Sequence, residues 1–277
     1  HMKDKWFIME EYKKKYSNQE LYDRMNISVE NIVAQNCNHI RSFIDVDSTV
    51  GLMCVKSAVK LQNNWKNKGV HIQLATQPLE GLAGKDANIK LFEEAADLCD
   101  IVGCLPSRDF DKSEEHLDIA FSTAKRLNKH VEAHLDQCNL PSENETSLFC
   151  DFVEKYDYRG KARTVHSISL ACQPLDRQQE IATRLALLNV GVIICPSAAI
   201  SMKQDSEQYA PIHNSIAPLK ILLDYGVDVG LGIDNINDIF MPYCDGNLTF
   251  ELRLLAEATR TYDINILEKI ATNKLGW

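Results

Sequence analysis

The stretch HVEAHLDQ, residues 130–137, decides how the fold is interpreted. It has the length and apolar content of a short buried strand, and its C-terminal end carries His134, Asp136 and Gln137. Parallel α/β folds build their active sites from side chains at the C-terminal ends of strands. We therefore expect His134 and its polar neighbours to lie at such an end.

Apolar runs of strand length recur along the chain at intervals of about thirty residues. Segments with apolar residues at helical spacing separate them, for example NIKLFEEAADLC at 88–99. This alternation predicts a parallel sheet, either a doubly wound sheet or an eight-stranded barrel. The seven candidate strands are HIRSFIDV (39–46), VHIQLAT (70–76), IVGCLP (101–106), HVEAHLD (130–136), RTVHSIS (163–169), GVIICPS (191–197) and DVGLGID (228–234).

Polar side chains gather at the C-terminal ends of several of these strands and favour the barrel, in which all strand ends share one mouth. No GxGxxG or GxxxxGK[ST] motif is present to hold a phosphate, which argues against a doubly wound nucleotide-binding sheet. We predict an α/β fold of the TIM type in one domain over residues 3–277, with residues 1–2 as a cloning scar. The strand-end residues are Asp45, Asp47, Gln77, His134, Asp136, His166 and Asp234.

The composition narrows the classes of partner. The net charge of -9 provides no basic surface for a phosphate backbone, so we expect no nucleic-acid partner. No apolar run reaches the ~20 residues of a membrane span, and the charged N-terminal stretch lacks the apolar core of a signal peptide. The nine cysteines show no CxxC spacing and are expected to be reduced and structural. These features predict a soluble, cytoplasmic protein.

His134, His166 and Asp234 form a candidate metal site. Each lies at or near the end of a candidate strand, so a barrel brings two imidazoles and a carboxylate together. This donor set suits zinc or divalent iron, and either ion acidifies a bound water into a nucleophile. Taken singly, the three residues are also explained as a hydrogen-bonded core histidine, a polar strand end and a helix N-cap. Their common position on one barrel face favours the metal site.

Seven motifs carry a resemblance to a known family. They are RSFIDVD (41–47), QLATQPLEG (73–81), CDIVGCLPS (99–107), HVEAHLDQ (130–137), ARTVHSISLA (162–171), VIICPSAAI (192–200) and GVDVGLGIDNINDIF (226–240). In this order they resemble the cytosine deaminase branch of the amidohydrolase superfamily over nearly the whole chain. The resemblance implies a (β/α)8 barrel with one divalent metal ion, zinc or iron, which hydrolytically removes ammonia or an amine from a small N-heterocycle. It implies that His134, His166 and Asp234 lie at the metal, and that Asp234 accepts the proton of the attacking water.

The sequence departs from this family at both ends. The family's first strand carries His-x-His, which supplies two further metal ligands, and none of the eight histidines here lies two positions from another. The first candidate strand aligns with the family's second, so we expect an incomplete barrel of about seven strands without the family's flanking β domain. The open strand edges predict a homodimer or a strand-exchanged oligomer. Without two of the expected ligands, the site should be mononuclear and bind its metal weakly.

Two positions in the resembling motifs concern the reaction and the substrate. Gln137 stands where the family has a proton-shuttling Glu, and an amide orients a substrate but cannot act as a general acid or base. In the motif PLEG, Leu79 stands where cytosine deaminases carry a substrate-binding Gln, and Glu80 follows it. We predict Leu79 and Glu80 as substrate-binding residues, Gln137 as a residue of the catalytic site, and a substrate other than cytosine.

Asn235, Asp238 and Asp136 have alternative explanations. Asn235 and Asp238 belong to a segment, 232–247, that would lie over the mouth of a barrel and bind substrate. Asn and Asp are also common turn residues, so the same segment is explained by loop geometry. Asp136 is expected either to cap a loop or to contact a ligand histidine.

Two hypotheses for the function remain. The first is a metal-dependent hydrolase or deaminase that uses metal-activated water on a C–N bond of a small cyclic amide, amidine or amino-heterocycle. It predicts that His134, His166 and Asp234 converge on one point. The second is a catalytically impaired barrel fragment that binds a small molecule or a partner subunit. The missing His-x-His and Gln137 motivate the second hypothesis.

Overall fold

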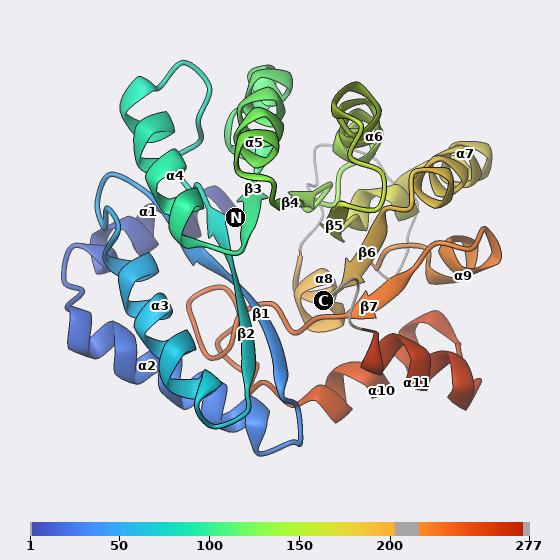
Figure 1. Cartoon of the computed structure of the whole chain (residues 1–277). Coiled ribbons are helices and arrows are strands. Elements are labelled where there is room, and N and C mark those ends of the chain that lie inside the picture. The colour runs from blue at the N-terminus through green and yellow to red at the C-terminus, as the bar shows by residue number, and fades with distance from the viewer. Residues whose placement is uncertain (1, 203–215, 274–277) are drawn as a thin grey trace. The chain divides into compact units, whose positions relative to one another are not determined.

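The computed structural model describes residues 2–202 and 216–273, except for the side chains of residues 2–4, 6 and 7. The chain divides into two compact units, His1–Glu132 and Ala133–Trp277. In each unit, strands alternate with helices along the chain (Figure 1). The strand order follows the chain order from β1 to β7, as in a (β/α) barrel and unlike a doubly wound sheet, in which the order reverses. Residues 203–215 and 274–277 of the predicted single domain lie outside the described residues.

The first unit contains three strands, the start of a fourth, and the helices around them. Its elements are α1 (Met2–Lys13), α2 (Asn18–Val33), β1 (His39–Asp45), α3 (Met53–Lys66), β2 (His71–Gln77), α4 (Asp86–Leu98), β3 (Ile101–Cys104), the short 3-10 helices η1 (Pro106–Arg108) and η2 (Phe110–Lys112), and α5 (Ser113–Leu127). Strand β4 (His130–Leu135) begins in this unit and ends in the second.

Strands β1 and β2 form a parallel pair whose C-terminal ends coincide. The register runs from His39 opposite His71 to Asp45 opposite Gln77. Helix α3 packs beside both strands and buries Val55, Leu61 and Trp65, which belong to one apolar cluster with Leu74 of β2. This burial, at roughly 1.5 to 3 kcal/mol for each large apolar side chain, holds the strand ends in place.

Helix α1 is joined to the end of β1 by a buried charge cluster. The Nζ atom of Lys13 lies 2.7 Å from Oδ2 of Asp45 and 2.5 Å from Oδ2 of Asp47. The Lys13 side chain is 3% exposed. Burial opposes its charge, but Asp45 and Asp47 outweigh that effect and raise the pKa of Lys13, so the ammonium stays charged.

The second unit continues the alternation from the end of β4. Its elements are α6 (Glu145–Tyr156), β5 (Ala162–His166), the 3-10 helix η3 (Ile168–Cys172), α7 (Leu175–Leu187), β6 (Gly191–Ile194), α8 (Pro196–Ser201), α9 (Leu219–Asp224), β7 (Val229–Leu231), α10 (Leu248–Thr259) and α11 (Ile264–Thr272). Strands β5, β6 and β7 pair in parallel, with Val192 of β6 opposite Thr164 on one side and Val229 on the other.

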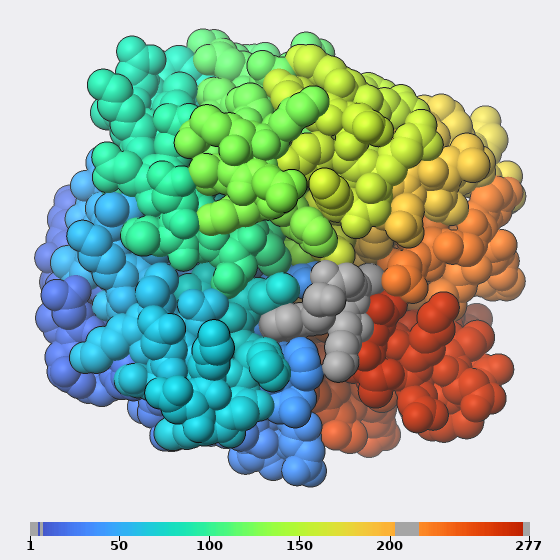
Figure 2. All heavy atoms as spheres, viewed as in Figure 1, coloured from blue at the N-terminus to red at the C-terminus, as the bar shows by residue number. Residues whose placement is uncertain are grey.

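The last two helices follow β7. Figure 1 shows α10 and α11 side by side, and the C-terminal part of the chain forms the red region of Figure 2. Helix α11 packs beside β7. At the end of α11, Nδ2 of Asn273 donates to the carbonyl oxygen of Val229 at 2.9 Å and to Oδ1 of Asp228 at 3.1 Å. An amide side chain thus satisfies a backbone oxygen of this short terminal strand, which limits exposure of its edge.

All seven predicted strands are present, but all except the second end earlier than predicted, and the last three end three residues early. The segment 163–169 leaves the strand at His166, because His166 and Ser167 have left-handed φ angles of 75° and 49°. The segment 191–197 ends at Ile194 because Pro196 opens α8, where a proline is compatible with the first helical turn. The predicted parallel α/β fold with an incomplete set of barrel strands is confirmed.

Candidate metal centre

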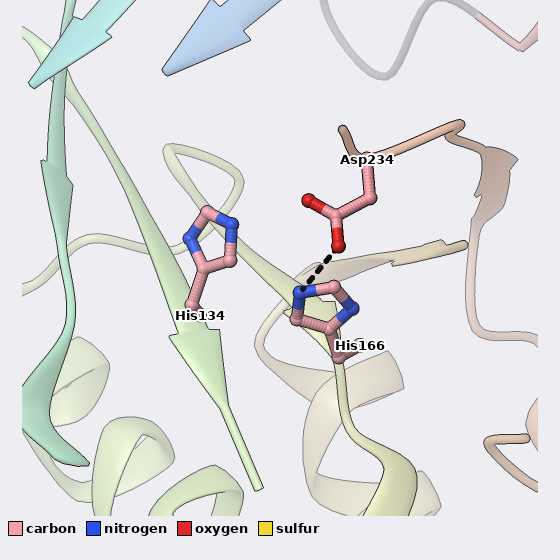
Figure 3. A group of neighbouring side chains, drawn as sticks. All are labelled: His134, His166 and Asp234. Atoms are coloured by element: carbon pink, nitrogen blue, oxygen red, sulfur yellow. Dashed lines mark ion pairs between the residues drawn. The ribbon is translucent and has the colours of Figure 1, made fainter. Parts of the chain in front are cut away.

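The second unit brings His134, His166 and Asp234 together (Figure 3). One nitrogen or oxygen donor from each side chain lies within 4.8 Å of the others. The two imidazole centroids are 5.0 Å apart, and Nε2 of His166 lies 4.0 Å from Oδ2 of Asp234. This group is the only cluster of at least three His, Cys, Asp or Glu residues with metal-binding spacing in the described parts of the chain. The predicted convergence of the three residues is confirmed.

Each side chain reaches the site from the C-terminal end of a strand. His134 precedes the last residue of β4, His166 is the last residue of β5, and Asp234 follows β7 after two residues. The backbone at His166 and Asp234 is left-handed, with φ of 75° and 70°. Such backbone costs about 1 to 3 kcal/mol for a residue other than glycine and persists only where the surroundings fix it. The turn after β5 is fixed in this way, since Ser167 donates its N–H to the carbonyl of Leu135 at 3.1 Å.

The protonation states suit metal binding. Burial lowers the pKa of His134 well below its usual value, and the nearby His166 adds to this effect. Burial alone lowers the pKa of His166 to about 4. Both imidazoles are therefore neutral near pH 7, the form that binds metal ions. Burial raises the pKa of Asp234 to about 7, with further contributions from the charges of Asp238 and Glu251.

Two neutral imidazoles and a carboxylate fit one divalent metal ion. Catalytic zinc sites commonly use three protein ligands of this kind and keep a fourth position for water. Nδ1 of His166 is buried and has no hydrogen-bond partner among the described residues, so it lacks the contact that would explain it as a structural histidine. The donors spread over up to 4.8 Å, whereas ligands in a tetrahedron with bonds of about 2.1 Å lie roughly 3.4 Å apart, so small side-chain shifts would close the set.

The structure bears on two of the structural explanations, the helix N-cap for Asp234 and the polar strand end for His166. Asp234 is not the N-cap of the next helix, because α10 begins at Leu248 and is capped by Asn247, whose side chain accepts the N–H of Phe250 at 2.9 Å. The long segment between β7 and α10 separates Asp234 from that helix. His166 does end a strand, as the polar strand-end explanation also expected, but its ring faces Asp234 (Figure 3).

Asp136 caps the start of helix α6. Its Oδ1 accepts the N–H of Glu145 at 2.7 Å, and its Oδ2 accepts the N–H of Thr146 at 3.2 Å. These are the first two N–H groups of α6, which lack partners within the helix. Gln137 comes next in the chain and is 7% exposed. Its predicted catalytic role remains a prediction.

The candidates in the segment 232–247 differ in their contacts. Asp238 accepts the N–H groups of Phe240 at 2.9 Å and Met241 at 2.8 Å, so its carboxylate forms a turn, as the loop explanation expected. Asp238 also raises the pKa of Asp234, which places its charge near the candidate metal centre. Asn235 directly follows Asp234 and is partly buried. A substrate contact by either residue remains a prediction.

Leu79 and Glu80 belong to the first unit. Glu80 accepts the N–H of Ser48 at 3.0 Å and the hydroxyl of Ser48 at 2.7 Å, so its carboxylate connects the loops after β1 and β2. Both residues line a small hollow of about 40 Å³ beside Lys13 and Arg108. Their predicted substrate contacts remain predictions.

Two glutamates near the centre were missed by the sequence analysis. Glu251 is 1% exposed on α10, accepts the N–H of Ser197 at 3.0 Å, and adds to the raised pKa of Asp234. Glu145 accepts the N–H of Asp136 at 2.9 Å. The sequence signal for Glu145 is an acidic residue in the first turn of a helix, which is common enough to carry little information. For Glu251 nothing in the local sequence marks it, because its partner is 54 positions away.

No protein-family model matches the chain. Among curated proteins, an uncharacterised protein of Haemophilus influenzae is 28% identical over 221 residues, which cover 79% of this chain and 79% of that protein. The N-isopropylammelide isopropyl amidohydrolase of Pseudomonas sp. (strain ADP) is 21% identical over 242 residues, which cover 85% of this chain and 56% of the enzyme.

Solved structures share the fold over most of the chain. The 5-methylcytosine deaminase of Klebsiella pneumoniae with 5-fluorocytosine has a TM-score of 0.90 at 16% identity, covering 98% of this chain and 66% of that one. The N-isopropylammelide isopropylaminohydrolase of Burkholderia multivorans has a TM-score of 0.75 at 20% identity, covering 88% and 59%. A mutant atrazine chlorohydrolase of Arthrobacter aurescens, complexed with zinc and atraton, has a TM-score of 0.59 at 14% identity and covers 92% and 57%.

Fold and site together define a class: an incomplete (β/α) barrel of the TIM type with a two-histidine, one-aspartate cluster. The predicted resemblance to the amidohydrolase superfamily is confirmed in the fold: the similar structures are a deaminase, an aminohydrolase and a chlorohydrolase, and one similar curated protein is an amidohydrolase. The chain spans between 57% and 66% of these solved structures. In the described ranges, no helix has the length and apolarity that a membrane crossing requires.

Proposed function

We propose that this chain is a metal-dependent hydrolase that removes ammonia or an amine from a small cyclic amide, amidine or amino-heterocycle. The convergence of His134, His166 and Asp234 carries the proposal, because it provides neutral nitrogen donors and one carboxylate at the C-terminal ends of barrel strands. The similar proteins support the substrate class, since their names describe a deaminase and an aminohydrolase of nitrogen heterocycles.

His134, His166 and Asp234 would hold one divalent ion, zinc or iron. When bound, such an ion acidifies a water molecule and so supplies the nucleophile. Asp234 would accept the proton of that water and transfer it to the leaving nitrogen. His166, whose Nε2 lies near the Asp234 carboxylate, would orient the reacting groups.

Gln137 would bind substrate rather than transfer protons. Its amide offers one acceptor and two donor hydrogens, which complement the alternating N–H and C=O groups of a cyclic amide. All proton transfers would then depend on Asp234. This arrangement predicts slow turnover compared with an enzyme that has a second carboxylate at position 137, since a positioned acid or base contributes roughly 10²- to 10⁴-fold. The substrate contacts of Leu79 and Glu80, and a substrate other than cytosine, stay predictions.

The second candidate function is a catalytically impaired relative that binds a small molecule or a partner subunit. Gln137 favours it, because this amide lies beside the metal cluster in sequence and cannot exchange a proton. Both candidate functions use the same cluster of His134, His166 and Asp234. They differ in whether a bound substrate is hydrolysed.

The test combines metal analysis with an activity screen on the full chain. The protein is loaded with Zn²⁺ or Fe²⁺, and bound metal is measured by mass spectrometry after dialysis. Ammonia or amine release is then followed with aminopyrimidines, triazinones and N-alkylated triazines. The variants are His134→Ala and Asp234→Asn, with His71→Ala as the control, since His71 lies at the start of β2 and is exposed.

We expect one metal ion per chain, retained in His71→Ala and lost in His134→Ala and Asp234→Asn, together with release from at least one compound. Stoichiometric metal without any turnover would favour the impaired relative. If the protein shows neither bound metal nor turnover, the proposed hydrolase is refuted. The cytoplasmic location, the single domain over residues 3–277, the homodimer or strand-exchanged oligomer and the absence of a nucleic-acid partner stay predictions.

A further inference from the structure

Asp136 uses all of its hydrogen-bonding groups to join three elements of the second unit. Its carboxylate accepts the N–H groups of Glu145 and Thr146, at 2.7 Å and 3.2 Å. Its own N–H donates to Oε2 of Glu145 at 2.9 Å, and its carbonyl oxygen accepts the N–H of Ser169 at 2.9 Å. The residue is 2% exposed. These bonds fix the end of β4 to the start of α6 and to η3.

The bonds between Asp136 and Glu145 are reciprocal, since each carboxylate accepts the N–H of the other residue. We call this pair the Asp136–Glu145 clamp. The N-cap residue of α6, Asn144, forms no capping bond with its own side chain, so the clamp supplies the cap that the helix start requires. The clamp therefore holds the two ends of the segment 137–144 next to each other.

A second set of bonds holds the interior of this segment. Glu143 accepts the N–H of Cys138 at 3.0 Å and also the hydroxyl of Ser169. Ser169 in turn accepts the N–H of Leu140 at 2.9 Å. Gln137 lies between Asp136 and Cys138. The N–H of Asp136 is bonded to Glu145 at the start of α6, and that of Cys138 to Glu143.

The backbone at Asp136 has a left-handed φ of 51°, which turns the chain sharply between β4 and Gln137. This conformation costs an aspartate free energy, and the four bonds of Asp136 offset that cost. His134 lies two residues before this turn, and Gln137 follows it directly. A change at the turn therefore moves Gln137 while β4 still holds His134.

We propose that Asp136 and Glu145 are positioning residues: the clamp sets the direction in which Gln137 presents its amide to the substrate. This inference rests on the proposed function, because that function assigns the substrate contact to Gln137. Preorganised binding groups need fixed backbones, and misplacement by about 1 Å can cost on the order of 10²-fold in rate. Removing two carboxylates from water costs free energy, and one capping residue would be enough to begin the helix.

The test weakens one side of the clamp and restores it. Glu145→Met keeps the length of the side chain but removes the acceptor for the N–H of Asp136, while the cap that Asp136 provides to α6 remains. Glu145→Gln retains an acceptor oxygen and serves as the rescue. Glu154→Ala is the control, since Glu154 lies exposed on the same helix and pairs only at the surface with Arg184.

Hydrogen exchange and nuclear magnetic resonance give readouts that need no activity. In Glu145→Met we expect exchange within 136–144 to rise about tenfold, the factor for the loss of one hydrogen bond, and the side-chain amide signal of Gln137 to shift. Glu145→Gln and Glu154→Ala should resemble the wild type in both. With an active substrate, Glu145→Met should raise KM about tenfold with less effect on kcat, because a binding contact is lost.

Unchanged exchange in Glu145→Met would refute the clamp. Faster exchange with an unshifted Gln137 signal and unchanged KM would refute the positioning role and leave a purely structural one. If Glu145→Met does not fold, Glu145→Ala takes its place, and the same comparison with Glu145→Gln applies. If no variant or wild type shows turnover, the proposed function fails, while the exchange data and the Gln137 signal still decide the clamp.

Discussion

Replacing Lys13 with methionine removes the one positive charge from a buried cluster in the first unit. The Lys13 side chain is 3% exposed and that of Asp47 is 4% exposed, and their charged atoms are 2.5 Å apart. Methionine fills a similar volume, so the change leaves packing nearly intact and isolates the charge. Asp45 and Asp47 then face each other without a counter-ion.

The expected loss of unfolding free energy follows from the burial of the remaining carboxylates. Removing one partner of a buried ion pair costs about 3 to 5 kcal/mol, because an uncompensated charge stays behind. Asp45 is 28% exposed, and solvent relieves part of its penalty, which places the expected loss near the lower value of about 3 kcal/mol. Burial also raises the pKa of Asp45, so the loss should be greater at pH 8 than at pH 5, where this carboxyl group takes up a proton more readily.

Urea unfolding followed by circular dichroism measures this loss. Lys14→Met is the matched control, since Lys14 neighbours Lys13 but pairs with Glu11 at the surface, where both side chains are more than half exposed, and no measurable change is expected. Adding Asp47→Asn to Lys13→Met should recover part of the stability, because Oδ1 still accepts the N–H groups of Thr49 and Val50. A loss below about 1 kcal/mol in Lys13→Met would refute the reasoning.

Three further predictions concern other parts of the chain. Burial raises the pKa of Glu143 from 4.5 to about 7, so the folded state binds a proton more tightly than the unfolded state. The unfolding free energy should therefore fall by about 3 kcal/mol as the pH rises from 4.5 to 7. Glu143→Gln should remove this pH dependence in urea titrations. Gly103→Ala should destabilise the fold by about 3 kcal/mol, measured by thermal unfolding, because a Cβ atom there meets the carbonyl oxygen of Thr76 at 2.0 Å. Gln137→Glu should raise kcat at least about tenfold in an ammonia-release assay, and an unchanged kcat would contradict the role given to position 137.

The sequence predicts the strands well because a buried parallel strand has a strong local signal. Runs such as GVIIC are apolar on both faces, and helices with charged outer faces separate them. The three-residue cluster was predicted for the same reason: each member lies at a strand end, and a parallel sheet brings such ends together. Strand ends were less accurate, because His166 and Ser167 leave the strand through backbone angles that their residue types do not require.

The supporting contacts could not be predicted, because they join residues far apart in the sequence through backbone atoms. Lys13, Lys14 and Lys15 form a charge run that is typical of a solvated surface, yet Lys13 alone is buried among the described side chains of that run. Likewise, Asp136 reaches Glu145 across nine positions, and no local pattern distinguishes that clamp from an ordinary loop. Tertiary packing decides both cases.

The donor set of His134, His166 and Asp234 has the composition of a three-ligand catalytic metal site. The low pKa values of both histidines predict little competition from protons at the imidazoles. The pKa of Asp234, raised to about 7, predicts that metal affinity still increases with pH up to about 7.

Titration of the metal-free chain with Zn²⁺ by calorimetry tests the central claim most directly. The account predicts one ion per chain, with binding abolished in His166→Ala and unchanged in His71→Ala. Absence of saturable binding in the wild type, or equal binding in His166→Ala, would contradict a metal centre formed by His134, His166 and Asp234.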